Sequence, residues 1–415
     1  MSSPHSIFQN KAARRLLIFG VLLTILSGLG QTFFIGLFSA ELRESLGLSD
    51  SAFGMAYSFA TIASAICMLW AGGLIDRIAV PRYAVGSVVV LSAGYLLLPL
   101  TGNILMLTLA LFLLRLGGQG LLTHTAVTSI AGYFGRARGK ALSIALLGHP
   151  TGEAFLPPIT VLLAASAGGW RVVWILAAML LLIVCPLLLY LGRGSSSRHE
   201  DHVTGATATD GIRTRSHDSS RGDVLRDRRF YLLLPTLLTP GFILTGIFIH
   251  QARLMEQKGW ALSWFAASFV IFAGTQAMGM LSVGSLIDRL TATRLMPWYL
   301  VPLGLACVAL SLSNDSLVLI PFMAGAGFTA GVGTSIVTAM WAETYGLAHL
   351  GAIRALGTSG MIFSTALSPP LFGWLIEREV RVVSILIACA MCVAIASTLA
   401  RIATKCKARD PVCLP

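Results

Sequence analysis

Long apolar segments separated by short polar breaks run along almost the whole chain. A segment of about 20 mostly apolar residues is long enough to cross a lipid bilayer as a helix. The polar breaks are as short as Thr101-Gly102-Asn103. The chain is therefore predicted to be an all-α, polytopic membrane protein with twelve spans: 16–40, 52–75, 83–101, 104–132, 140–166, 170–191, 230–252, 262–286, 295–313, 316–344, 350–376 and 381–403.

One polar stretch, residues 192–229, is much longer than the others and separates the sixth span from the seventh. It is rich in Ser, Gly, Asp and Arg, a composition that does not bury a core. We therefore predict an N-terminal six-helix bundle over 1–191, a flexible cytoplasmic linker over 192–229, and a C-terminal six-helix bundle with a short tail over 230–415.

Composition and charge support a membrane class. Of 415 residues, 55% are hydrophobic and only 12% are charged, whereas soluble domains carry about 25% charged residues. The net charge of +12 comes from basic residues in short loops, without interleaved aromatic residues, so nucleic acid is not an expected partner. The seven cysteines form no disulfide pattern and are interpreted as small apolar or incidental residues.

The distribution of lysine and arginine predicts the orientation. If the N-terminus is cytoplasmic, 23 basic residues lie on the cytoplasmic side, one of them in loop 10–11, and six lie on the opposite side. Cytoplasmic loops of membrane proteins carry this excess. We expect both termini in the cytoplasm and the protein in the plasma membrane, the inner membrane of a bacterial cell.

The two halves of the chain repeat one another at an offset of 212 residues. Gly73-Leu-Ile-Asp76-Arg77, followed by Arg82, reappears as Ser285-Leu-Ile-Asp288-Arg289, followed by Arg294. The same offset pairs Gly139 with Gly351, Gly148 with Gly360, and Pro157-Pro158 with Pro369-Pro370. An internal repeat in a chain this apolar indicates a secondary transporter.

These motifs resemble those of the major facilitator superfamily. The segment Gly73–Arg82 resembles its loop signature, and Arg115-Leu-Gly-Gly-Gln119-Gly120 resembles its fourth-helix arginine motif. The resemblance implies two six-helix bundles, a midplane cavity lined mainly by spans one, four, seven and ten, and rocking between inward-open and outward-open states.

The loop cluster has a physical interpretation of its own. Asp76 can pair with Arg77 or Arg82, or lie at the N-terminus of a neighbouring helix, where anions are favoured. Such a contact is a conformational latch if it stabilises one state and is released in another. The alternative is that the arginines only hold the loop inside. A carboxylate adds nothing to that retention, yet both copies have one (Asp76 and Asp288).

Glycine and proline mark matched positions in spans five and eleven. Pro157-Pro158 and Pro369-Pro370 predict helix kinks beside a cavity, and Gly139, Gly148, Gly152, Gly351 and Gly360 predict close helix packing. Gly139, Gly148 and Gly152 fit part of the glycine-proline motif of drug antiporters, but Glu153 stands where that motif has proline. The departure counts against a drug–proton antiporter.

Several ionisable residues occur in the first half only. Arg115 aligns with Gly327, Gln119 with Gly331, His149 with Met361 and Glu153 with Thr365. A charge inside a span is costly, so Arg115 should face protein or water, as an anion contact, a coupling residue or a hydrogen-bond donor to backbone carbonyls. Gln119 lies one turn further on, on the same expected face.

Glu153 and His149 lie one turn apart in span five. A carboxylic acid in an apolar site holds its proton more readily, and histidine titrates near neutrality. The pair is a candidate for proton coupling. Structural pairing of Glu153 with a neighbouring helix and direct substrate contact remain alternatives.

Weaker candidates complete the set. Gln31 can line the cavity, and His250, near the external end of span seven, can gate or bind. Glu343 is expected to anchor a loop rather than to bind a ligand.

The sequence offers no enzyme chemistry: it has no phosphate-binding Gly-Lys-Ser/Thr loop, no clustered metal ligands and no nucleophile elbow. No cofactor or metal is expected. The sequence therefore predicts a secondary transporter, a symporter or antiporter, of a small organic solute such as a monocarboxylate. Its expected partners are the lipid bilayer, the substrate and, in a coupled mechanism, protons, and it is expected to function as a monomer. The alternatives are an exporter of amphipathic drugs or metabolites and a transporter-like sensor that does not transport.

Overall fold

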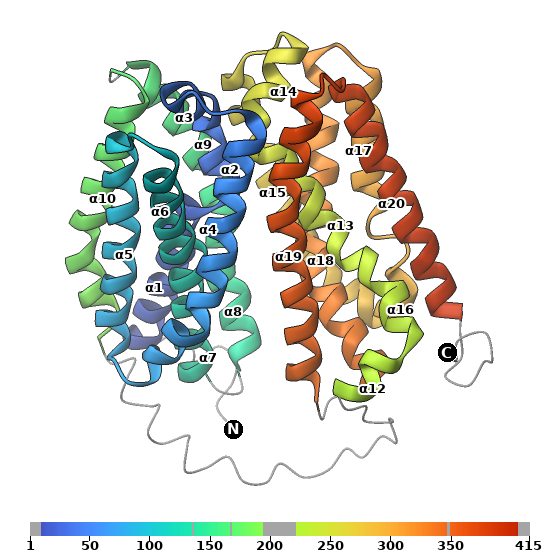
Figure 1. Cartoon of the computed structure of the whole chain (residues 1–415). Coiled ribbons are helices and arrows are strands. Elements are labelled where there is room, and N and C mark those ends of the chain that lie inside the picture. The colour runs from blue at the N-terminus through green and yellow to red at the C-terminus, as the bar shows by residue number, and fades with distance from the viewer. Residues whose placement is uncertain (1–9, 135–136, 167, 194–220, 347–348, 406–415) are drawn as a thin grey trace. The chain divides into compact units, whose positions relative to one another are not determined.

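The computed structural model describes residues 10–134, 137–166, 168–193, 221–346 and 349–405, and within them every regular element is a helix (Figure 1). Residue contacts divide the chain into two compact units. The first comprises Met1–Leu48 with Met55–Gly211, and the second comprises Ser49–Gly54 with Ile212–Pro415. The first turn of α4 (Asp50–Ala71) therefore groups with the second unit, and the rest of α4 with the first.

The helices of the first unit follow the apolar segments of the N-terminal half. In chain order they are α1 (Lys11–Ser27), η2 (Gly28–Gly30), α2 (Thr32–Ile35), η3 (Gly36–Phe38), α3 (Ser39–Leu46), α4, η4 (Gly72–Asp76), α5 (Val80–Leu97), η5 (Leu98–Leu100), α6 (Ile104–Leu114), η6 (Arg115–Leu122), α7 (Thr123–Phe134), α8 (Arg138–Leu146), α9 (Gly148–Ser166) and α10 (Trp170–Leu191).

The second unit continues in the same way through the C-terminal half. Its helices are α12 (Arg221–Arg226), α13 (Arg228–Ile249), α14 (Gln251–Lys258), α15 (Leu262–Leu290), α16 (Ala292–Leu295), α17 (Val301–Leu312), η9 (Ser316–Val318), α18 (Leu319–Tyr345), α19 (Leu350–Glu377) and α20 (Val382–Lys405).

The all-α membrane architecture is confirmed. Among the described residues, ten helices are long and apolar enough to cross a membrane. The two other predicted spans correspond to the pair α8–α9 and to α17, a shorter apolar helix. Large apolar side chains point outward from α10, where Leu180 is 56% and Ile183 is 73% exposed. Such a surface suits lipid rather than water.

The first predicted span, residues 16–40, is broken rather than continuous. α1 ends at Ser27, a 3₁₀ turn follows, and Gln31 has an extended backbone (φ −88°, ψ 159°) before α2 begins. The expectation of one uninterrupted helix was therefore wrong. Apolar periodicity does not show a break that close helix packing imposes, and this break places Gln31 and Thr32 inside the unit.

Two other boundaries also differ from the prediction. The ninth span was expected from residue 295, but α17 begins at Val301 with Pro302 in its first turn, a position that tolerates proline. The linker was expected to end at 229. Residues 194–220 of it lie outside the described residues, but α12 and the start of α13 already lie within its last part. The Asp227 side chain caps α13 by accepting from the Arg229 backbone N–H at 2.9 Å.

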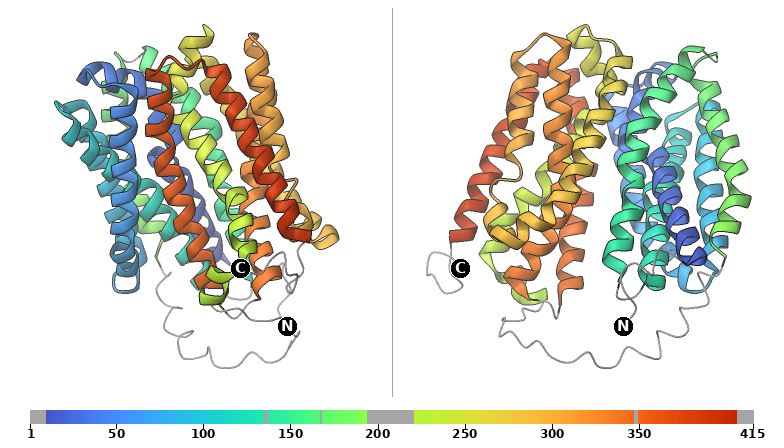
Figure 2. Two further views of the ribbon diagram at one scale, coloured as in Figure 1. Left: turned by 45° about the vertical axis from the view of Figure 1, so that its right-hand side comes forward. Right: turned by 180° about the vertical axis from the view of Figure 1, so that it is seen from behind.

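Aromatic packing fixes the broken first span within its unit. The Trp174 ring centroid lies 5.8 Å from that of Phe34, 5.0 Å from that of Phe38 and 4.8 Å from that of Tyr95. The Tyr95 hydroxyl donates to the Leu29 carbonyl at 2.8 Å. These contacts hold η2, α2 and η3 against α5 and α10, which lie side by side (Figure 2).

In the second unit, α13 packs against α19 and α20, and α15 packs against α18. At the end of α13, the Phe248 ring packs at a steep angle against the rings of Phe269 and Phe272, with centroid distances of 5.1 and 5.5 Å. α13, α18 and α19 also frame the pocket of this unit.

Candidate functional site

The buried cation of the first unit lies where α6 changes its winding. Arg115 is the first residue of η6, a π-helical segment of 8 residues, and it is only 4% exposed. Its guanidinium carbon lies 5.1 Å from the centroid of the Tyr57 ring. Short π-helical segments are rare and occur often at functional sites. This burial agrees with the prediction that Arg115 faces protein or water rather than lipid.

A small polar network surrounds the Arg115 side chain. Its Nη1 donates to Thr32 Oγ1 at 3.5 Å, and Thr32 Oγ1 lies 2.6 Å from the Tyr57 hydroxyl. Thr32 comes directly after the break at Gln31, so the break brings a hydroxyl to the cation. The sequence interpretation did not include Thr32 or Tyr57, because threonine and tyrosine in an apolar span look like ordinary packing residues.

Arg115 has no acidic partner in the described part of the chain. No carboxylate lies within ion-pair distance of it, and its Nε makes no hydrogen bond there. Inserting an arginine at mid-membrane costs about 2.5–3.5 kcal/mol on insertion scales. An aromatic face and one long hydrogen bond leave most of its five donors unused, which makes the group suited to bind an anion.

Two glycines beside Arg115 allow the neighbouring helices to approach closely. A Cβ at Gly117 would lie 2.7 Å from the Leu91 backbone nitrogen, and a Cβ at Gly118 would lie 2.6 Å from Gly30 Cα. Both contacts are to backbone, which does not yield easily. The Gly-Gly pair of the arginine motif therefore sets the distance of η6 from α5 and from η2.

We expect Gly118→Ala to destabilise the first unit by about 1–3 kcal/mol, the usual range for overpacking. Gly120→Ala is the matched control, because the nearest atoms to its Cβ would be in the flexible Met68 side chain, at 3.0 Å, and the Arg115 carbonyl oxygen would lie at an ordinary contact distance of 3.6 Å. Thermal denaturation of the purified protein in detergent measures the difference. Equal midpoints for the two variants would contradict the packing role of Gly118.

The structure places the remaining candidates of the first half near the same break. His149 Nδ1 lies 3.2 Å from Ser27 Oγ, at the end of α1. Glu153 is half-buried on α9, one turn after His149. Gln31 is half-buried at the break itself, whereas Gln119 is exposed although Arg115 is buried. The described contacts include no hydrogen bond between Arg115 and Gln119, so the expected shared face is not evident.

Both copies of the loop cluster lie at exposed positions. Asp76, Arg77 and Arg82 at the end of η4 and the start of α5 are exposed, as are Asp288, Arg289 and Arg294 around the end of α15. Within the described residues neither copy forms an ion pair. The latch therefore remains a prediction about another conformation or partner.

Glu343 has the anchoring role expected of it. Its carboxylate accepts from the backbone N–H groups of Ala292 and Thr293, at 2.8 and 2.9 Å, and from the Thr293 hydroxyl at 2.6 Å. It thereby caps the amino end of α16, the short helix that contains Arg294.

The matched glycines and prolines have unequal surroundings. Gly148 packs tightly on α1, where an added Cβ would lie 2.4 Å from the Val21 carbonyl oxygen, and Gly152 lies near the Ile25 carbonyl. Gly360 approaches only the side chains of Leu238 and Leu234, whereas Gly139 and Gly351 have open space around them. All four prolines lie inside helices: Pro157 and Pro158 in α9, and Pro369 and Pro370 in α19.

His250 is buried in the second unit at the end of α13. Its Nε2 lies 2.9 Å from the Pro369 carbonyl oxygen, and its Nδ1 lies 3.5 Å from Asp50 Oδ1. Asp50 belongs to the short segment Ser49–Gly54 that groups with this unit. His250 thus contacts α19 and the first turn of α4, and it also lines a small cavity of about 30 Å³.

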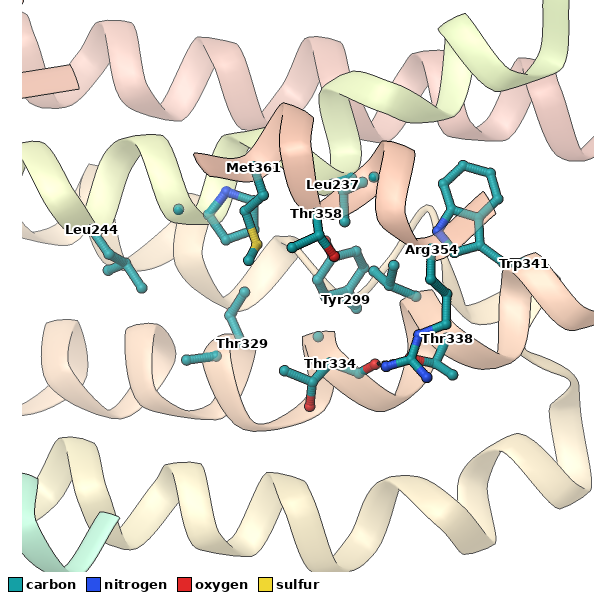
Figure 3. A pocket seen from close by; sticks show the side chains of 16 residues that line it. Leu237, Leu244, Tyr299, Thr329, Thr334, Thr338, Trp341, Arg354, Thr358 and Met361 are labelled. Atoms are coloured by element: carbon teal, nitrogen blue, oxygen red, sulfur yellow. Dashed lines mark hydrogen bonds between the residues drawn. The ribbon is translucent and has the colours of Figure 1, made fainter. Parts of the chain in front are cut away.

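The second unit contains a pocket of about 360 Å³ (Figure 3). Ligand sites commonly have volumes of about 300–1,000 Å³ and mainly apolar walls. The apolar wall here includes Leu237, Pro240, Leu244, Trp341 and Met361. The polar groups include the hydroxyls of Thr329, Thr334, Thr338 and Thr358, together with Arg354.

The interpretation that the informative charges are confined to the first half was incomplete. Arg354, the basic residue that the charge count assigns to loop 10–11, lines this pocket from α19. It was missed because a cation near the cytoplasmic end of a span looks like a topology signal. Its counterpart in the repeat is Leu142, and that difference was the available clue.

Comparisons with known proteins agree with this architecture. Residues 20–312 match the family model of the Major Facilitator Superfamily. A relative described as an uncharacterized MFS-type transporter, YcxA of Bacillus subtilis (strain 168), is 24% identical over 295 residues, which cover 69% of each chain.

Two solved structures of a bacterial homolog of the human lysosomal transporter Spinster share the fold. The inward-facing, unoccupied form has a TM-score of 0.70 and 16% identity, and the match covers 95% of this chain and 98% of that one. The inward-facing, occupied form has a TM-score of 0.61 and 16% identity, with 98% of both chains covered.

A family model that spans most of the chain, a helical membrane fold and a two-half repeat all lead to one assignment. The chain belongs to the Major Facilitator Superfamily and is a multi-pass secondary transporter rather than an enzyme.

Proposed function

We propose that this transporter moves a small organic anion, such as a monocarboxylate, by alternating access. The observation that supports the proposal most directly is Arg115, a buried cation with no acidic partner among the described residues. A carboxylate is the planar, two-oxygen group that a guanidinium binds best. A bound anion would supply the charge compensation that the protein itself does not provide.

Coupling to a proton gradient is part of the same proposal. His149 and Glu153 lie on α9, which packs against α1 and η2, and these elements lead to Gln31 and Thr32. Net movement of an anion against its gradient needs an energy source. A proton gradient supplies one if a carboxyl group gains a proton on one side of the membrane and loses it on the other during the cycle. We propose symport of the anion with a proton through Glu153.

The proposed setting is the plasma membrane of the cell, the inner membrane in a bacterium, with both termini cytoplasmic. Lysine and arginine counts support this orientation. The proposed partners are the surrounding lipid, the substrate and the proton. The protein is proposed to act as a monomer and to bind no nucleic acid.

Export of amphipathic molecules is the second candidate. The pocket of the second unit supports it, because apolar side chains form much of its wall.

Uptake of radiolabelled carboxylates and of the cationic dye ethidium, compared in cells with and without the protein, separates the anion transporter from the exporter. Protein-dependent movement of carboxylates supports the anion transporter, and protein-dependent removal of ethidium alone would contradict it. Carboxylate binding without any accumulation would instead indicate a transporter-like sensor that does not transport.

The loop cluster gives a separate prediction. We expect Asp76→Asn to slow transport several-fold while the protein still inserts normally, since the carboxylate serves no topological need. Lys140→Gln is the control, because it removes an exposed basic charge at the start of α8, outside the cluster. Initial uptake rate and membrane-inserted protein are measured on the same cells. A wild-type rate at wild-type expression would show that Asp76 is no latch.

A further inference from the structure

Three helices of the second unit line its pocket with stripes of different polarity. On α19, Arg354, Thr358 and Met361 follow one another at spacings of four and three residues, so they share one helix face. They change from a cation to a hydroxyl to a thioether over about 10 Å of helix, at 1.5 Å per residue. The pocket therefore has a polar end and an apolar end.

The facing helices contribute no charged residue to the wall, so the cation of α19 alone marks the polar end. On α13 the lining residues Leu237, Pro240 and Leu244 are apolar, and on α18 Trp341 lies toward the end where α19 contributes Arg354. Figure 3 shows Trp341 and Arg354 toward one end of the pocket and Leu244 and Met361 toward the other.

Only some of the polar groups have a donor to offer a ligand. The Thr329 hydroxyl donates to the Gly325 carbonyl at 2.8 Å, and the Thr338 hydroxyl donates to the Thr334 carbonyl at 2.9 Å. Each hydroxyl has a single proton, so these two groups can only accept. The side chains of Thr334, Thr358 and Arg354 make no hydrogen bond in the described part of the chain, and the donors of Thr358 and Arg354 lie one turn apart on α19 at the polar end.

Electrostatics favour an anion at that end. None of the sixteen described residues that line the pocket is acidic, and Arg354 forms no ion pair within the described ranges. Arg354 also lies near the amino end of α19, which favours negative rather than positive charge. Its position is thus not explained by the helix dipole, and the repeat has apolar Leu142 at the equivalent place.

We propose that this pocket binds an amphipathic organic anion, with its acid group at Arg354 and Thr358 and its apolar body along Leu244 and Met361. The proposal rests on the proposed function, because it names the class of anion that the transporter carries. It adds a requirement that Arg115 alone does not impose: the substrate has an apolar body as well as an acid group.

The test is isothermal titration of the purified full-length protein in lipid nanodiscs with sodium octanoate, octylammonium chloride and 1-octanol. Empty nanodiscs correct for partition into lipid. We expect octanoate to bind at least tenfold more tightly than octylammonium. Affinity should also rise from butyrate to octanoate by roughly fourfold for each methylene, from about 0.8 kcal/mol per buried group.

Matched variants separate the two ends of the pocket. Arg354→Gln should abolish the preference for octanoate over octylammonium and leave 1-octanol unaffected. Thr358→Val, which keeps the shape, should weaken octanoate binding several-fold. Ala330→Phe, which fills the pocket, should weaken all three probes. Arg378→Gln is the control, because Arg378 lies at the other end of α19 and does not line the pocket.

The outcomes distinguish this inference from the proposed function. Absence of octanoate binding to the wild-type protein, or an unchanged preference in both Arg354→Gln and Thr358→Val, overturns the pocket assignment. If cells still accumulate carboxylates in that case, the proposed function stands without it. If octanoate binds as expected but the protein moves no organic anion, the proposed function fails and the pocket assignment stands.

Discussion

Replacing Arg115 by glutamine is expected to lower carboxylate transport by about 30-fold or more, while the protein still folds and inserts. Loss of one partner from a buried charge pair costs roughly 2–5 kcal/mol, and about 1.4 kcal/mol corresponds to a factor of ten. The loss should appear mainly as weaker apparent affinity, because the bound anion is then the buried charge left without a partner.

Arg115→Lys gives a finer test of the same contact. Lysine keeps the charge but lacks the planar fork that binds both carboxylate oxygens, so apparent affinity should fall several-fold. Arg171→Gln is the matched control: Arg171 also lies over an aromatic ring, 4.4 Å from the Trp170 centroid, but it is exposed at the start of α10. Wild-type affinity in both Arg115 variants would assign Arg115 a structural role.

Glu153→Gln is expected to eliminate accumulation driven by a pH gradient and to leave exchange of substrate intact. Glutamine keeps the size of the side chain and removes its titration, and exchange across the membrane needs no net proton movement. Proteoliposomes with an imposed pH gradient measure accumulation, and preloaded proteoliposomes measure exchange.

Glu256→Gln is the control for the glutamate substitution, because Glu256 is exposed on α14 and pairs with Arg253 at 2.6 Å. Undiminished accumulation in Glu153→Gln would place the proton pathway elsewhere or show that transport is not proton-coupled.

The sequence predicted the helical architecture well, because a membrane span is specified by length and apolarity alone. It failed at Gln31, since the break there arises from close packing of Gly30 against Gly118 on a helix distant in sequence. A hydropathy pattern contains no information on such pairings.

The candidate site was predictable only where placing a residue type in a membrane costs much free energy. Arg115 stood out for that reason and is buried as expected. Tyr57 and Thr32 contact it, but tyrosine and threonine cost little free energy in a membrane span, so the sequence did not point to them. Gln119 was expected on the Arg115 face by α-helical spacing, but η6 is π-helical, so that spacing does not hold there. Arg354 was overlooked because its charge already had an explanation in topology.

Counterflow in proteoliposomes tests transport of an organic anion most directly. Vesicles containing the purified protein are preloaded with unlabelled octanoate and benzoate and diluted into trace radiolabelled octanoate or benzoate, without ATP, with protein-free vesicles as the reference. We predict transient accumulation of labelled carboxylate by the wild-type protein, and none above the reference by Arg115→Gln. Counterflow of radiolabelled ethidium in ethidium-loaded vesicles, with no counterflow of either carboxylate, would contradict the proposed function.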